Sequence, residues 1–344
     1  MICWNPLSLL TFIAIFVFLN FSLASAEADF ALDCDNYPYE QDAQAVITAI
    51  KEGNEGGVYC LLKHGADKDG VDQYGNTPVM AAAVRGETRI VQALMDKGAK
   101  LDTQDKHGYT ALMKATSKDY HDITVMLIES GNAGIDLQSG DDGYTAMMIA
   151  AINNNLNGPI RCPATVGALL KAGADLSLRS KGDLDGGKTV LHWAAMKGRD
   201  SIVRALLKKM NMDLIDAQDN QGRTAIMCAV DKNAQTAVTQ LLDKGASLRI
   251  LTAHGDSALS IAIAYANREL ITQILDAGWN RGESIDLLIN VGLKGTFRSI
   301  YYYVAKKFEP TIESVMAILD SMGFRWSPSY NETASSAGTH GGDL

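Results

Sequence analysis

A short motif recurs along this 344-residue chain at a nearly constant interval. Each copy holds a Gly, one further residue and a Thr or Ser, followed by small and apolar residues, as in "GKTVLHWAAMKG" from Gly187 to Gly198. The hydroxyl residue recurs with gaps of 33, 35, 44, 35 and 33 residues, at Thr77, Thr110, Thr145, Thr189, Thr224 and Ser257. A repeat of this length predicts stacked supersecondary units, each contacting only its neighbours, rather than one globular core.

A second pattern occupies the other half of each unit. An amphipathic segment ends in Gly-Ala, as in "LLKAGAD" ending at Asp175 and "LLDKGAS" ending at Ser247. Such a segment predicts a helix with one buried face and a Gly at its C-terminus. Together the two patterns resemble the ankyrin repeat, whose period is about 33 residues and whose core reads T-P-L-H-x-A. The resemblance covers residues 41–283.

The resemblance implies an all-α solenoid of about seven to eight helix pairs, joined by β-hairpin finger loops. Within each unit, the Gly supplies the positive φ of a tight turn, and the Thr caps the first helix through its side-chain oxygen. A small pair such as Ala194 and Ala195 lets neighbouring helices approach closely. Residues 41–66 lack the motif, and we expect them to form a first helix pair that caps the stack.

The fourth unit is longer than the others. Thr145 and Gly173 are 28 residues apart, whereas Thr77 and Gly98 are 21 apart, so seven extra residues lie in "NNNLNGPIRCPA". Four more lie in the finger loop that follows, "SLRSKGDLDGGKT". Long loops on a rigid scaffold often carry function, and they are also where neutral insertions are tolerated.

The N-terminal segment has a different composition. Residues 7–26 are apolar and end in Ala24, Ser25 and Ala26, and no charged side chain precedes Glu27. This predicts a secretory signal peptide over residues 1–26, although its start lacks Lys and Arg. The protein is then exported, either periplasmic or secreted. The alternative is an uncleaved membrane anchor. The other expected segments outside the repeats are an acidic extension (27–40), a divergent helical unit (284–325) and a disordered tail (326–344).

Export permits disulfides, and the chain has five cysteines, of which Cys3 is lost with the signal peptide. In an ankyrin stack, Cys60, Cys162 and Cys228 lie in different units, too far apart to pair with one another. Cys34 lies on the N-terminal extension and can reach Cys60, so we expect a disulfide between these two. Cys228 replaces an apolar helix position and is expected to be a buried thiol.

The sequence contains no catalytic or metal-binding constellation. Its net charge is −9 (31 − 40), without a basic patch for nucleic acid. None of the six histidines has metal-ligand spacing, and no G-x-S-x-G motif or phosphate-binding Gly loop occurs. His192 stands at the T-P-L-H histidine, where the family uses it structurally. We therefore expect no enzyme, no cofactor, no metal and no small-molecule substrate.

The resemblance implies a protein-binding module whose partner lies on the concave face, formed by the fingers and the exposed ends of the first helices. Carried over by position, the candidate contacts are Tyr74, Arg85, His107, Tyr109, Lys118, Tyr144, Lys188, Arg223 and Tyr265. The tyrosines are favoured because Tyr is enriched in binding hot spots. In the alternative interpretation, their rings pack on neighbouring fingers and stiffen them. A membrane-tethered structural scaffold, held by an uncleaved N-terminal helix, is the alternative to an exported binding module.

Overall fold

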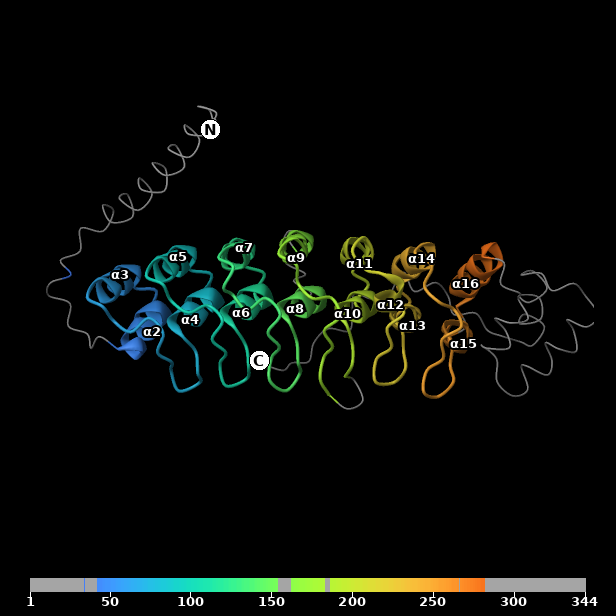
Figure 1. Ribbon diagram of the computed structural model, residues 1–344, viewed down its shortest axis with the longest axis horizontal. Coiled ribbons are helices and arrows are strands. Elements are labelled where there is room, and N and C mark those ends of the chain that lie inside the picture. The colour runs from blue at the N-terminus through green and yellow to red at the C-terminus, as the bar shows by residue number, and fades with distance from the viewer. Residues whose placement is uncertain (1–33, 35–41, 154–161, 183–185, 266, 282–344) are drawn as a thin grey trace, which may run out of the picture. The chain divides into compact units, whose positions relative to one another are not determined.

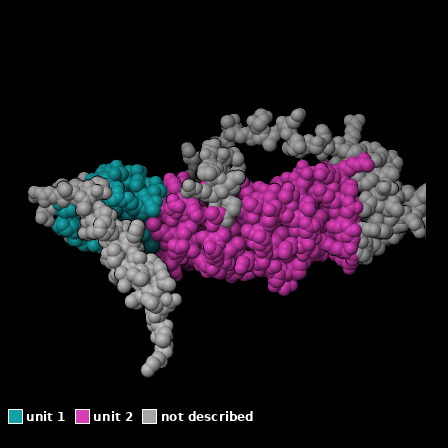
Figure 2. Space-filling view, turned by 90° about the horizontal axis from the view of Figure 1, so that it is seen from above, with its two compact units in different colours: residues 1–106 teal, residues 107–344 magenta. Residues whose placement is uncertain are grey.

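A computed structural model describes residues 34, 42–153, 162–182, 186–265 and 267–281 of the chain (Figure 1). The chain divides into two compact units, residues 1–106 and residues 107–344 (Figure 2), and each is described by itself. Over the described ranges the regular structure is helical, and the finger loops contain no regular strand. The fingers are therefore turns closed by a few backbone hydrogen bonds rather than the β-hairpins that the resemblance predicts.

The part of unit 1 that the structure describes contains two stacked helix pairs. Its helices are α2 (Ala43–Glu52), α3 (Glu55–Lys63), α4 (Pro78–Arg85) and α5 (Thr88–Asp96). Helix α2 packs on α4, and α3 packs on α5. The first pair forms without the repeat motif: Asp42 caps α2 in place of a Thr, accepting a hydrogen bond from the Ala45 backbone N–H at 2.7 Å.

Unit 2 contains five helix pairs and one additional short helix in the part that the structure describes. Its helices are α6 (Ala111–Ser117), α7 (His121–Glu129), α8 (Ala146–Ile152), α9 (Cys162–Lys171), α10 (Val190–Met196), α11 (Asp200–Leu207), α12 (Met212–Ile215), α13 (Ala225–Asp231), α14 (Gln235–Asp243), α15 (Ala258–Ala264) and α16 (Arg268–Asn280). The first helix of each pair packs on the first helix of the next, which gives an inner row of α6, α8, α10, α13 and α15. The second helices give an outer row, and the fingers project beyond the inner row (Figure 1). This is the helical solenoid, without a sheet, that the repeat period predicts.

The hydroxyl residue of the motif starts the inner helices. Thr110 and Thr145 are buried, and each side-chain oxygen accepts a hydrogen bond at 3.2 Å from the backbone N–H three residues later. Ser257 caps α15 in the same way at 3.1 Å. Thr224 differs, because it precedes α13 without a side-chain cap bond. In most repeats, then, one hydroxyl residue, Thr or Ser, both ends the finger and caps the first turn of the helix.

The motif glycine is required for two reasons. Gly143 and Gly222 have φ values of 65° and 75°, which an L-residue with a side chain rarely adopts. A Cβ on Gly143 would stand 2.7 Å from the Lys181 backbone nitrogen, and one on Gly222 would stand 2.8 Å from the Ala253 nitrogen. Each glycine therefore turns its own finger and leaves room for the backbone of the next finger.

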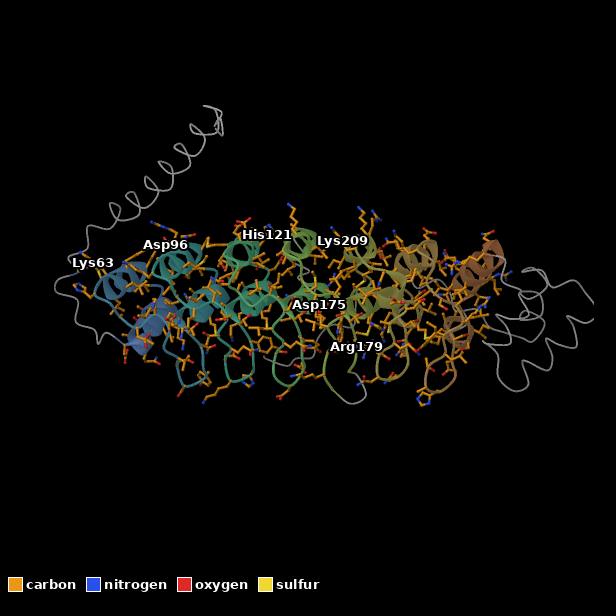
Figure 3. The ribbon with its side chains drawn as sticks, in the orientation of Figure 1. Lys63, Asp96, His121, Asp175, Arg179 and Lys209 are labelled. Carbon is orange, nitrogen blue, oxygen red and sulfur yellow. A yellow bond between two sulfur atoms is a disulfide. The ribbon has the colours of Figure 1, made fainter. Side chains whose placement is uncertain are left out.

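The outer helices are amphipathic. In α11, Ile202, Val203 and Leu206 are buried against the neighbouring helices, whereas polar side chains face outward. Figure 3 shows Lys209 on the outer-row side of unit 2 and Arg179 on the finger side. The fingers and inner helices therefore form one surface of unit 2, and the outer helices form another.

The extra residues of the fourth unit fall in two segments, one after α8 and one in the finger that follows α9. Residues 154–161, between α8 and α9, are outside the described ranges. The enlarged finger begins at Ser180, whose backbone N–H donates to the Lys188 carbonyl at 2.9 Å. Asp219 and Arg223 make the same closing bond, also at 2.9 Å, across a finger four residues shorter. The insertion therefore leaves the closing hydrogen bond at the base of the finger unchanged.

Among the described residues, no helix is long and apolar enough to cross a membrane. The expected signal peptide (1–26), helical C-terminal unit (284–325) and tail (326–344) lie outside the described residues, as does the extension at 27–40 apart from Cys34. Cys34 is joined by a disulfide to Cys60 of α3, with 5.1 Å between their Cα atoms.

Candidate functional site

Successive fingers of unit 2 are hydrogen-bonded to one another through their backbones. In each case an N–H at the base of one finger donates to a carbonyl near the tip of the preceding finger. The bonds, between 2.7 and 3.2 Å long, run from Gly140 to His107, from Lys181 to Asp142, from Asn220 to Gly186 and from Ala253 to Gln221. In unit 1, Lys106 makes the equivalent bond to Tyr74 at 3.2 Å. These bonds fix the spacing of the finger tips within each unit.

A side-chain clamp reinforces the fingers of unit 2. The Gln138 amide donates to the carbonyl of Gly143 in its own finger at 2.8 Å and to the Arg179 carbonyl in the next finger at 2.7 Å. Arg179, at the equivalent position, donates to the Gly187 carbonyl at 3.2 Å and to the Gln218 carbonyl. Gln218 repeats the arrangement toward the following finger, through the carbonyls of Gly222 and Leu251. Sequence reasoning missed these residues; their signal is a long polar side chain directly before the first residue of each of these three fingers.

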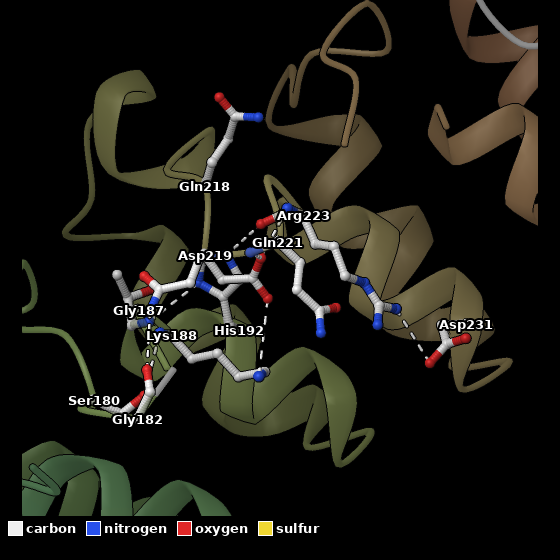
Figure 4. A network of polar contacts seen from close by, with 12 residues as sticks. Ser180, Gly182, Gly187, Lys188, His192, Gln218, Asp219, Gln221, Arg223 and Asp231 are labelled. Carbon is white, nitrogen blue, oxygen red and sulfur yellow. Dashed lines mark hydrogen bonds and ion pairs between the residues drawn. The ribbon is translucent and has the colours of Figure 1, made fainter. Parts of the chain in front are cut away.

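One predicted contact residue, Lys188, is buried. Its side chain turns inward beneath its finger (Figure 4), and the residue is 3% exposed. Its Nζ lies 3.9 Å from Asp219 Oδ2 and 5.5 Å from the centre of the Trp193 ring. The buried carboxylate and the face of the indole offset the cost of removing the ammonium from water. We therefore remove Lys188 from the candidate binding face.

His192 is a buried scaffold residue. Its Nδ1 accepts from the Thr189 backbone N–H at 3.2 Å, so Nε2 carries the proton and donates to the Arg223 carbonyl at 3.0 Å. Burial lowers the pKa of His192 to about 4, which keeps the ring neutral. The ring thus links the start of α10 to the next finger, in agreement with the structural role that the sequence predicts.

Cys228 is the thiol next to this network. Burial raises its pKa to about 11, so the side chain is protonated at neutral pH and is a poor nucleophile. Among the described residues, no group of three or more His, Cys, Asp and Glu side chains could hold a metal ion. The polar network of Figure 4 is accordingly a structural element of the finger bases.

The most exposed aromatic contact on the inner helices of unit 2 is Tyr265, which directly follows α15 and is 54% exposed. Its hydroxyl donates to Asp231 Oδ1 at 2.7 Å, and Arg223 Nη2 lies 3.1 Å from Asp231 Oδ2. Burial alone would raise the pKa of Asp231, but the bonds from Tyr265 and Arg223 hold it below its usual value. The structure thus brings Arg223 and Tyr265, two of the predicted contacts, onto one carboxylate.

The other predicted tyrosines differ in exposure. In unit 2, Tyr109 is half-buried, with Lys114 Nζ 5.8 Å from its ring centre. Tyr144 is also half-buried, and its ring meets Trp193 edge-on with 5.5 Å between centroids. In unit 1, Tyr74 is 57% exposed. The contacts of Tyr144 favour the alternative in which a finger ring stiffens the scaffold.

The remaining predicted contacts are exposed. In unit 2 these are His107, at a finger, and Lys118, which directly follows α6. In unit 1, Arg85 at the end of α4 is exposed, with its Nε 3.7 Å from Glu87 Oε1. After the removal of Lys188, the candidate face of unit 2 consists of the finger tips and the exposed ends of the inner helices.

The chain was compared with known families and structures. A family model described as "Ankyrin repeats (3 copies)" matches residues 21–105, 44–141, 101–179 and 160–252. The ankyrin repeat domain of Bcl-3, described as a unique member of the IkappaB protein family, aligns with a TM-score of 0.56 and 25% identity. That alignment covers 67% of this chain and 97% of the solved one.

Two curated proteins are similar over shorter segments. The mouse nuclear factor NF-kappa-B p105 subunit is 37% identical over 110 residues, and the human transient receptor potential cation channel subfamily A member 1 is 28% identical over 86. These segments are 31% and 25% of this chain and only 11% and 8% of those proteins. The similarity is therefore confined to a part of each relative. Because the family model matches most of the chain, this protein belongs to the ankyrin-repeat family.

Proposed function

We propose that this protein is an exported binding module that docks one protein partner on the fingers and inner helices of its repeats and performs no catalysis of its own. Ankyrin repeats are protein–protein interaction modules, and the fold neighbour is an ankyrin repeat domain. Specificity in such a module depends on surface side chains rather than on the shared fold.

The observation that carries the proposal is the position of Tyr265. The ring is exposed on the inner row, while its hydroxyl is held by Asp231, which Arg223 holds in turn. An aromatic side chain fixed before contact loses little entropy on binding, and Tyr and Arg are enriched in hot spots. Tyr265 and Arg223 therefore offer a prearranged anchor on a surface whose fingers are clamped.

Export is supported by two features. Residues 7–26 have the composition of a signal peptide. The disulfide between Cys34 and Cys60 suits an oxidising compartment, because cytosolic reductants keep thiols reduced. N-terminal sequencing of protein from its native host tests this part: Glu27 as first residue supports export, whereas an intact N-terminus in the membrane fraction supports the tethered scaffold.

Crosslinking and affinity capture in the native compartment test the binding face. Tyr265→Ala should reduce capture of the partner at least tenfold, because it removes the anchor ring. Tyr120→Ala is the matched control, since Tyr120 is also an exposed tyrosine of unit 2 but directly precedes the outer helix α7. Equal capture by both variants, with unchanged thermal unfolding midpoints, would contradict the assignment of the inner face.

A further inference from the structure

The inner helices of unit 2 carry a row of exposed cationic side chains. Each inner helix is followed by a residue that stands eight positions after the capping hydroxyl of the motif. In the four consecutive repeats from α6 to α13, these residues are Lys118, Asn153, Lys197 and Lys232. The three lysines are exposed. We call these four residues the inner-helix row.

The row is continuous from one repeat to the next. The Asn153 side-chain amide donates to the carbonyls of Thr116 and Ser117, at 2.9 and 2.8 Å, so the second position of the row lies against the end of α6. The inner helices α6, α8, α10 and α13 pack in sequence. Adjacent packed helices lie ~10 Å apart, so the row advances by about that distance per repeat.

The charge of this surface is opposite to that of the whole chain. The inner helices of unit 2 and the residues that follow them contain four cations, Lys114 and the three row lysines, and one anion, Asp231, which gives 4 − 1 = +3. The whole chain carries −9, so the remainder carries −9 − 3 = −12. Asp231 itself is paired with Arg223 at 3.1 Å and with Lys232 at 3.3 Å. Asp231, the one anion in this count, is therefore paired with two cations.

We propose that the inner-helix row binds an acidic, extended segment of the protein partner. An extended chain in the polyproline II conformation has three residues per turn and rises ~3.1 Å per residue, so every third side chain lies on one side and advances by ~9 Å, close to the ~10 Å step of the repeats. The matching segment carries Asp or Glu opposite each of the three lysines and an uncharged polar residue opposite Asn153. This inference rests on the proposed function and adds the chemistry of the partner.

A protein segment fits this surface better than a nucleic acid or an anionic membrane. Nucleic acids and anionic membranes carry dense negative charge over a large area. The remainder of the chain, with a net charge of −12, would repel that negative charge. A short acidic peptide places its few charges on the row alone. The favourable contacts are then local, and they weaken as salt is added.

The test is fluorescence anisotropy with the full mature chain and labelled ten-residue peptides. One peptide carries Glu at positions 1, 7 and 10, Ser at position 4 and neutral polar residues elsewhere; a second has the same composition with its three Glu adjacent. We expect the spaced peptide to bind at least threefold more tightly than the clustered one. The triple variant Lys118→Glu, Lys197→Glu and Lys232→Glu should weaken binding of the spaced peptide tenfold or more.

The matched control reverses three exposed lysines at the ends of outer helices α9, α11 and α14, namely Lys171, Lys208 and Lys244. This control changes the net charge by the same amount but leaves the inner-helix row intact. We therefore expect it to weaken binding of the spaced peptide less than threefold. Circular dichroism shows whether the triple Lys→Glu variant of the inner-helix row folds. If it does not fold, the corresponding triple Lys→Gln variant replaces it, and we expect that variant to bind the spaced peptide at least threefold more weakly than the wild type.

Equal losses in the two triple variants would overturn the proposal, because net charge alone would then explain the binding. Tighter binding of single-stranded DNA, or of vesicles rich in anionic lipid, than of the spaced peptide would overturn it as well. If the native partner is still lost on Tyr265→Ala while no acidic peptide binds, the proposed function stands and the acidic segment is excluded.

Discussion

The Tyr265 hydroxyl and the Asp231 carboxylate are joined by a 2.7 Å hydrogen bond between residues 34 positions apart. The bond connects the ends of α13 and α15, two neighbouring helices of the inner row. It also fixes the direction of an aromatic ring that is otherwise exposed. A contact of this kind both stabilises the scaffold and orients the surface that the scaffold presents.

Replacing Tyr265 by Phe should separate these two effects. The ring stays, but Asp231 loses one donor to its charged form, so its pKa should rise toward the ordinary value. The free energy of unfolding should fall by no more than about 1 kcal/mol, the net value of one hydrogen bond. NMR titration of Asp231 measures the pKa change, and an unchanged value would show that the bond is not formed in solution.

His192→Met should have effects of opposite sign at high and low pH. At pH 7.5 the variant should be less stable by about 1 kcal/mol, because the bond to the Arg223 carbonyl is lost. The pKa of His192 is about 4 in the folded state and 6.5 ordinarily, so the unfolded chain binds a proton first as the pH falls. Wild type therefore loses stability between pH 6.5 and 4, by about 2–3 kcal/mol at pH 4.5.

Methionine has no such proton, and four sister repeats already carry Met at this position, namely Met80, Met113, Met148 and Met227. Chemical denaturation at the two pH values should show the variant less stable at pH 7.5 and more stable at pH 4.5. A constant difference at both pH values would contradict the buried, neutral histidine.

Gly222→Ala should be more destabilising than a glycine substitution without a neighbouring finger. The new Cβ would stand 2.8 Å from the Ala253 nitrogen at a φ of 75°, so we expect a loss of about 2–4 kcal/mol. Gly173→Ala is the control, with a φ of 82° and no atom within 4 Å of the added Cβ. It should cost about 1–2 kcal/mol. Equal thermal unfolding shifts would show that adjacent fingers are not in contact.

Tyr144 and Tyr74 should respond differently to substitution by Ala. Tyr144 meets Trp193 edge-on, so its removal should destabilise unit 2 by about 1–3 kcal/mol. Tyr74 is 57% exposed, and its removal should change stability by no more than about 0.5 kcal/mol. If Tyr144→Ala instead abolishes partner capture at an unchanged unfolding midpoint, Tyr144 is a binding residue rather than a scaffold residue.

Peptide mapping under non-reducing conditions should recover Cys34 and Cys60 in one linked fragment from freshly isolated protein. The bond closes a loop of 26 residues, worth about 3 kcal/mol in the chain-entropy model. Reduction should therefore lower the unfolding midpoint of the wild type but not that of a Cys34→Ser, Cys60→Ser variant. Two free thiols in native material would exclude the bond and weaken the case for export.

The parts of the fold that were predicted from the sequence follow local rules. The positive φ of Gly143 and the helix cap of Thr145 depend on the residue itself and its immediate neighbours, so the motif indicates both. The helix pairs follow from the same period. The clamps of Gln138 and Gln218 could not be predicted in this way, because one of the two acceptors of each side chain is a carbonyl of the next finger.

The candidate site was harder to predict for a related reason. Lys188 has the polarity of a surface residue, and its burial depends on Asp219 and Trp193, which only the folded finger brings beneath it. Tyr265 and Arg223 were predicted as contacts because the repeat gives their positions. Their shared partner Asp231 was not, since a tertiary contact has no signature in the spacing.

The closing hydrogen bond at the base of the enlarged finger is the same as in a shorter finger, so the length of this finger does not change how the repeats stack. Ser180 and Lys188 make the bond that Asp219 and Arg223 make, although more residues lie between them. Lys181 and Gly186 within this finger also make backbone hydrogen bonds to Asp142 and Asn220 of the adjacent fingers, so the residues between Lys181 and Gly186 can be exchanged without removing these bonds. This finger is therefore a natural place to graft a foreign peptide for display, and a place where related chains can diverge in length while keeping the same frame.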